Sequence, residues 1–221
     1  MTATSDAERI DGALRAALGA LRPPPKQTLS EWAEANLRLP SDVTANPGRL
    51  RLIPYQRAIL DSIGDPNVER VTFCKPVRVG YTMALTTALA AMIANDPAST
   101  ILLLPTEEDC RNFARSDLDP LLDGNPAIGS LLSGEVDDTG RSTLLARRFA
   151  GGSLKIIPAR SPARLRAHTA RVLIADEIDA MEQTAEGNPL RLAERRTLSF
   201  SRRKLVMGST PTYEGTSNVL R

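Results

Sequence analysis

VTFCKPVRVGYT, residues 71–82, begins as a short apolar strand and ends in a basic loop that opens into a helix. A second stretch, VLIADEID at residues 172–179, is a run of apolar residues that ends in two carboxylates, Asp176 and Glu177. In open α/β sheets, ligand crevices lie at the carboxyl ends of the strands. The two stretches together therefore predict a phosphate-binding loop that faces a metal-and-water site, as in a nucleoside-triphosphate hydrolase.

The loop departs from the usual phosphate-loop pattern GxxxxGK[ST], in which backbone N–H groups wrap the phosphates, the Lys reaches their oxygens and the hydroxyl binds magnesium. Gly80 and Thr82 occupy the second Gly and the Ser/Thr positions, but Tyr81 stands where the Lys should be. Lys75 at the start of the loop and Arg78 within it still supply positive charge. For the loop alone, a Gly-containing turn between a strand and a helix is the better interpretation.

The carboxylates of the second stretch favour the catalytic interpretation. Asp176 is the candidate metal ligand, and Glu177 is the candidate general base that polarises the attacking water. A core strand followed by an acidic helix cap is the alternative for such a segment alone. Because a candidate phosphate loop lies about 95 residues upstream, we favour the hydrolase.

The composition is that of an ordinary globular protein with an uneven charge. Of 221 residues, 42% are apolar and 24% charged, and no apolar run approaches the ~18 residues of a membrane span. Cys74 and Cys110 lack CxxC partners, which indicates a reducing, cytosolic compartment. Residues 141–221 hold 15 basic and 7 acidic residues, which indicates either a surface facing a polyanion or a solvated basic face.

The N-terminal region reads as an arm. Residues 5–21 have apolar residues at helical spacing, and three prolines at 23–25 follow as a stiff spacer. We therefore predict an arm and linker over residues 1–27 and one α/β domain over residues 28–221.

Within that domain, strands alternate with helices, which predicts a mostly parallel sheet with helices on both faces. The apolar segments predict strands at 70–74, 99–104, 143–149, 153–158, 171–175 and 204–208. Helices are predicted at 30–39, from 54 onward, and at 81–95, 106–117, 126–132 and 189–198, with an Arg-rich loop over 159–170.

Three segments in order, KPVRVGYT, VLIADEID and MGSTPT, resemble the ATPase domain of the large terminase subunit of lambda-like tailed phages, over roughly residues 30–221. The resemblance implies a RecA-like, additional-strand P-loop NTPase that hydrolyses Mg-ATP to move double-stranded DNA into procapsids. It also implies a terminase small subunit and a portal as partners, a homo-oligomeric ring in the working motor, and a place in the host cytoplasm rather than in a membrane.

The resemblance also assigns residues. The deviant Walker A loop would comprise Lys75, Arg78, Val79, Gly80, Tyr81 and Thr82, with Thr82 and Asp176 binding Mg2+ and Glu177 as the catalytic carboxylate. Ser209-Thr210-Pro211 would be the coupling segment, in which Thr210 senses the γ-phosphate. Tyr55 and Gln56 match an adenine-recognition motif, although Tyr55 could equally be packing of a Pro-started helix. Arg166, ahead of Arg164, is the candidate arginine that reaches a neighbour's γ-phosphate; the alternatives for these arginines are contacts to DNA phosphates or a solvated loop.

Members of that family continue into a nuclease domain, and we expect no nuclease activity from this chain. Two other functions stay open from the sequence. One is a helicase-type ATPase that remodels nucleic acid, which would carry a second RecA-like lobe. The other is a non-enzymatic nucleic-acid-binding module that uses the basic C-terminal part.

Overall fold

The fold is built around one six-stranded sheet, seen in a computed structural model that describes residues 10–15, 17, 27–41, 44, 46–132 and 144–220. The strand order is β3-β8-β7-β4-β6-β5, parallel throughout except for the antiparallel pair β5-β6. The sheet strands are β3 (Arg70–Cys74), β4 (Ser99–Leu104), β5 (Ala146–Phe149), β6 (Gly152–Pro158), β7 (Val172–Asp176) and β8 (Lys204–Ser209).

The strand order confirms the predicted fold class. β3 carries the basic loop and β7 carries the two carboxylates, and β8 is inserted between them. An extra strand between these two is what the additional-strand class requires. All three strands run in the same direction, so the loop, the carboxylates and the Ser209 end of β8 meet at one edge of the sheet.

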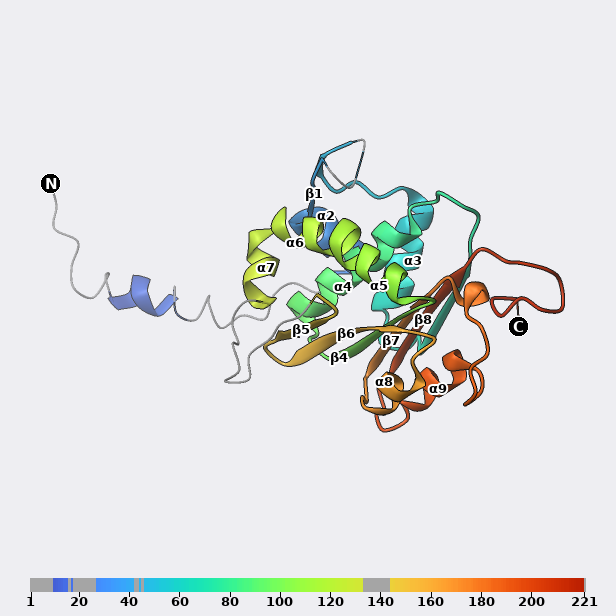
Figure 1. Ribbon diagram of the computed structural model, residues 1–221. Coiled ribbons are helices and arrows are strands. Elements are labelled where there is room, and N and C mark those ends of the chain that lie inside the picture. The colour runs from blue at the N-terminus through green and yellow to red at the C-terminus, as the bar shows by residue number, and fades with distance from the viewer. Residues whose placement is uncertain are drawn as a thin grey trace, which may run out of the picture.

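Helices cover both faces of the sheet, unequally (Figure 1). One face carries a thick layer, and the α-helices that the described residues place on the other are α8 and α9, which lie below the sheet in the view shown. The thick layer holds α2 (Leu29–Asn36), α3 (Pro54–Gly64), α4 (Tyr81–Asn95), α5 (Glu107–Asn112), α6 (Asp119–Asp123) and α7 (Pro126–Leu132). The thin layer holds α8 (Pro162–Arg166) and α9 (Pro189–Arg195).

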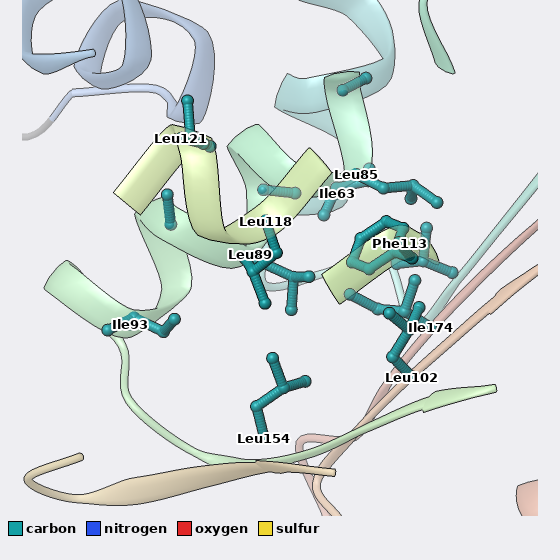
Figure 2. Close-up of a cluster of buried hydrophobic side chains, with 14 of the residues drawn as sticks. Ile63, Leu85, Leu89, Ile93, Leu102, Phe113, Leu118, Leu121, Leu154 and Ile174 are labelled. Atoms are coloured by element: carbon teal, nitrogen blue, oxygen red, sulfur yellow. The ribbon is translucent and has the colours of Figure 1, made fainter. Parts of the chain in front are cut away.

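Each face has its own hydrophobic core because successive strand residues point to opposite sides. On β4, Leu102 joins the cluster under α4, where Leu89 and Phe113 pack on Ile174 and Leu154 (Figure 2). Leu103, the next residue, joins the other cluster instead. Burial on both faces explains why strands β4 and β7 have continuous apolar runs rather than alternating ones.

The prediction that the first domain helix continues to residue 39 is wrong. Thr28 and Glu31 form the capping box that starts α2, but the helix ends at Asn36. Arg38 and Leu39 then form β1, which pairs with β2 (Gly48–Arg49). Asn125 accepts a hydrogen bond from Arg38 N–H at 2.8 Å and donates one to its carbonyl at 2.7 Å. A side chain 87 residues away thus satisfies the backbone that a longer helix would have used.

Two more predictions need correction. The segment predicted as one helix from 106 to 117 passes from α5 into a π-helical turn, Phe113–Leu118, before α6. The Arg-rich stretch predicted as loop contains α8, which Pro162 starts and buried Leu165 anchors to the thin layer. Between Ile178 and Ala180 the chain also makes a single 3-10 turn.

Two predicted elements are shorter than expected, because α9 ends at Arg195 and not at 198, and β5 begins at Ala146 after a turn and not at 143. Several other elements match their predictions. Helices α4 and α7 have the predicted ends, and β5 and β6 form the predicted hairpin around Gly151. Of the arm helix predicted over 5–21, the described residues 10–15 and 17 are helical, and the rest lies outside the described residues. Among the described residues, no helix is both long and apolar enough to cross a membrane.

Candidate functional site

The basic loop leaves the sheet at the end of β3 and enters α4 at Tyr81. Gly80 is the N-cap of α4, has φ +73°, and provides no side-chain cap. The first N–H groups of α4 therefore face the loop without an intrahelical partner, and such groups bind anions. Thr82, half-buried, lies in this first turn. The geometry is that of a phosphate cradle at the carboxyl edge of a parallel sheet.

The loop is pinned from one side by the helix that begins at Pro54. Tyr55 Oη donates to the carbonyl of Val79 at 2.8 Å, and Gln56 Nε2 donates to the same oxygen at 3.3 Å. Glycine suits the φ of +73° at residue 80, and a Cβ there would lie 2.7 Å from Gln56 Nε2, so the Gln56 amide would have to shift. Gln56 Oε1 accepts from Ile53 N–H, so both ends of its amide are engaged.

Lys75 lies between the two carboxylates of β7. Its Nζ is 2.7 Å from Glu177 Oε1 and 3.0 Å from Asp176 Oδ1, and its side chain is only 7% exposed. The candidate phosphate-loop lysine is thus in direct contact with the candidate catalytic carboxylates, although Glu177 lies 102 positions away in the sequence. Arg78, the other cation of the loop, is exposed and has φ +61°, a backbone conformation that is unfavourable for residues other than glycine.

Burial and charge act against each other on these groups. Burial lowers the pKa of Lys75, but the carboxylates of Glu177 and Asp176 outweigh it and hold that pKa above its ordinary value. Burial raises the pKa of Asp176, and Lys75 offsets this only in part. Burial and then the charge of Asp176 also raise the pKa of Asp117, on the π-helical turn. The site is therefore a partly dehydrated cluster in which a cation is strongly favoured.

Ser209, at the end of β8, joins the loop to the carboxylate turn. Its carbonyl accepts from Lys75 N–H at 3.0 Å, and its hydroxyl accepts from Asp179 N–H at 3.1 Å. Asp179 in turn accepts from Thr212 N–H and Val219 N–H, each at 2.9 Å. Thr210, next to Ser209, is half-buried at this junction. Hydrogen bonds therefore connect the basic loop and the turn after Glu177 to the segment after β8.

The candidate arginines do not form one cluster. Arg166 pairs with Glu186, Arg164 lies 3.6 Å from Glu107, and both side chains are about half exposed. Both follow β6, whose end lies at the same edge of the sheet as Glu177. Arg171, by contrast, comes before β7 and pairs with Asp96 at 2.8 Å, at the opposite edge.

Sequence reasoning gave no role to Gly208, Asp179 or Asp117. Gly208 was within the MGSTPT segment and Asp179 within VLIADEID, so their positions in those motifs were the available signal. For Asp117 no sequence signal pointed to the site. Asp117 lies on the π-helical turn, and its pKa responds to the charge of Asp176; the helical sequence pattern did not indicate that turn.

Residues 44–221 match the family described as "Phage terminase large subunit gpA, ATPase domain". The chain belongs to this family. It is 30% identical to the terminase large subunit of Escherichia phage lambda over 220 residues, and 27% identical to that of Enterobacteria phage P21 over 221 residues. These alignments cover 98% and 97% of this chain, which spans only 34% of the length of each relative.

Solved terminases share the fold of this terminase domain. The HK97 bacteriophage large terminase superposes with a TM-score of 0.60 at 11% identity, over 82% of this chain and 36% of that one. The large terminase ATPase domain of Thermus phage P74-26 gives 0.53 at 17% identity, over 73% of this chain and 66% of that one. At these identities the likeness concerns the fold alone.

Proposed function

We propose that this terminase domain binds and hydrolyses Mg-ATP and is the motor that drives double-stranded DNA into procapsids in the host cytoplasm. The observation that carries the proposal is the contact of Lys75 with Asp176 and Glu177 beside the uncapped start of α4. A phosphate-binding cation, a metal-binding carboxylate and a general base are the three parts that phosphoryl transfer needs.

Each residue has a proposed task. Lys75 exchanges its carboxylate partners for phosphate oxygens, and the N–H groups at the start of α4 bind the same phosphates together with Arg78. Glu177 then accepts the proton of the attacking water. In the oligomeric ring, Arg166 of a neighbouring copy contacts the γ-phosphate. Thr210 transmits the loss of the γ-phosphate to the segment after β8.

The residues present fit a magnesium ion. Mg2+ is usually held by one or two protein oxygens together with phosphates and water, and Asp176 with Thr82 supplies that set. The described residues accordingly contain no cluster of three or more His, Cys, Asp or Glu that would hold a metal alone. When bound, the ion neutralises developing charge on the phosphates.

Adenine recognition is proposed for the Tyr55 and Gln56 pair. The Tyr55 ring is 43% exposed and can stack on a base. Gln56 is 8% exposed and bonded to Ile53 and Val79, and the second hydrogen and second oxygen lone pair of its amide are the groups that would read the adenine edge.

The non-enzymatic alternative is less well supported because several basic residues of the C-terminal part are engaged with partners within the domain. Arg160 pairs with Glu182, Arg203 pairs with Glu69, and Lys204 donates to the carbonyl of Asp65. The small subunit, the portal and the ring of like subunits are proposed partners on the strength of the family.

Glu177→Gln tests the central assignment. Calorimetry should show ATP affinity that depends on magnesium and is retained in the variant, while turnover falls by about 100- to 10,000-fold because the general base is lost. Glu182→Gln, at an exposed carboxylate paired with Arg160, is the matched control and should turn over like the parent protein. Turnover by E177Q at the parent rate would remove Glu177 from the mechanism, and absence of Mg-ATP binding would remove the proposed function.

A further inference from the structure

The residue that replaces the usual phosphate-loop lysine is buried instead of reaching into the loop. Tyr81 is 3% exposed, and its ring stacks on Phe73 with centroids 5.2 Å apart and an interplanar angle of 24°. Burial and then the charges of Asp176 and Glu177 raise the pKa of Tyr81, so the phenol stays neutral. Its hydroxyl has no hydrogen-bond partner among the described residues.

Gly208 provides the space for this ring. A Cβ at residue 208 would lie 2.3 to 2.6 Å from three atoms of the Tyr81 ring and hydroxyl, far closer than a side chain can approach. The strand register pairs Gly208 with Phe73 on one side and with Asp176 on the other. Phe73, Gly208 and Asp176 lie side by side on three neighbouring strands. Tyr81 therefore lies over the space left by the missing side chain of Gly208, between those of Phe73 and Asp176.

Lys75 lies over this buried ring. The ammonium Nζ lies 5.0 Å from the Tyr81 ring centroid, within the range of a cation–π interaction. The Lys75 side chain is 7% exposed, and such interactions are strongest where water is excluded. Tyr81, which stands where the usual pattern has a lysine, thus supplies an aromatic surface for Lys75 at the start of the loop.

We infer that Tyr81 is a positioning residue: its ring, seated over Gly208, holds the Lys75 ammonium at the phosphate site. This inference rests on the proposed function, because it assigns to Tyr81 the task of keeping Lys75 aimed at the nucleotide. The Tyr81 side chain acts through Lys75 and does not itself touch the phosphates. The pair Tyr81–Gly208 compensates for the displaced lysine of this loop.

The first test reads the geometry without nucleotide. In lysine-labelled protein, the Lys75 side-chain resonances, assigned by their loss in Lys75→Ala, should be shifted by the ring current of Tyr81. The shift should disappear in Tyr81→Leu and persist in Tyr81→Phe. Phe149→Leu, a buried aromatic on the edge strand β5, is the matched control and should leave the shift in place. An unshifted Lys75 in the parent protein would overturn the inference.

The second test is a double-mutant cycle on Mg-ATP affinity. We expect Tyr81→Leu to weaken binding by about 3- to 10-fold, the range of a desolvated cation–π contact, and Tyr81→Phe to recover most of that loss. In the Lys75→Ala background, Tyr81→Leu should have no further effect, because Tyr81 acts through Lys75. A full additional loss in that background would show an independent role and overturn the inference.

The outcomes separate this inference from the proposed function. If the parent protein binds no Mg-ATP, the proposed function fails, and the Lys75 shift still decides whether Tyr81 holds the ammonium. If Tyr81→Leu does not fold, trifluorophenylalanine at position 81 keeps the ring shape while removing its negative face. Retention of full affinity with the fluorinated ring would overturn the cation–π role.

Discussion

At the scale of single residues, Arg78 combines a useful charge with an unfavourable backbone. Its φ of +61° costs a residue with a side chain about 1–2 kcal/mol relative to the right-handed region, a cost that glycine avoids. Arg78→Gly should therefore be more stable than Arg78→Ala by about 1 kcal/mol in urea unfolding, although glycine usually destabilises ordered segments.

Both variants of Arg78 lose the guanidinium, so they should weaken Mg-ATP binding to the same extent. Lys75→Ala should weaken it more than either, since Lys75 is the buried cation between Asp176 and Glu177. Calorimetric affinities of the three variants decide the order. If Lys75→Ala binds like the parent protein while the Arg78 variants do not, Arg78 is the main phosphate ligand.

At the scale of elements, Asp179 fixes the segment after β8 to the turn that carries Glu177. The carboxylate accepts from the backbone N–H groups of Thr212 and Val219 and from the Thr212 hydroxyl. Asp179→Ala should therefore accelerate hydrogen exchange across residues 212–219, while exchange in β4 stays unchanged. Asp109→Ala, which removes the carboxylate that accepts from Thr106 N–H in the capping box of α5, is the matched control and should accelerate exchange only near that helix.

The same carboxylate predicts a pH dependence. Burial would raise the pKa of Asp179, but its hydrogen-bond donors outweigh burial and hold the pKa below its ordinary value. A depressed folded-state pKa adds stability above the unfolded pKa of about 3.9, and this stability is lost as the pH falls through the folded value. The difference in unfolding free energy between parent and Asp179→Asn should be present at pH 7 and shrink in acid. A difference that grows in acid would contradict the assignment.

Elements were predictable from the sequence where local pattern and tertiary burial agree. The helix at 81–95 has a loop glycine before it and buried Ala and Leu along it, and its ends were predicted correctly. The helix at 30–39 failed because Asn125, far away in sequence, bonds the backbone of Arg38. The site shows the same division. The predicted ends of two strands gave the positions of Lys75 and Asp176 at the sheet edge. The placement of Tyr81 over Gly208, however, depends on a strand register that no single segment encodes.

At the scale of the whole molecule, one sheet supports two cores. Leu102 and Leu103 are adjacent, both are fully buried, and they face opposite layers. Leu102→Ala and Leu103→Ala should each lower the free energy of unfolding by about 2–5 kcal/mol through lost contacts and a cavity. Leu198→Ala, at a leucine that is 65% exposed, is the matched control and should change it by no more than about 0.5 kcal/mol.

The shared strands should also make the two layers unfold together. Trp32, the single tryptophan, packs against the core of the thick layer, whereas Leu103 belongs to the thin one. Trp32 fluorescence should therefore report the Leu103→Ala destabilisation at the same denaturant concentration as far-ultraviolet circular dichroism. If the Trp32 transition kept its parent midpoint while the circular dichroism transition moved, the layers would be independently stable. Signals from the nucleotide edge could then not pass through the sheet as one cooperative unit.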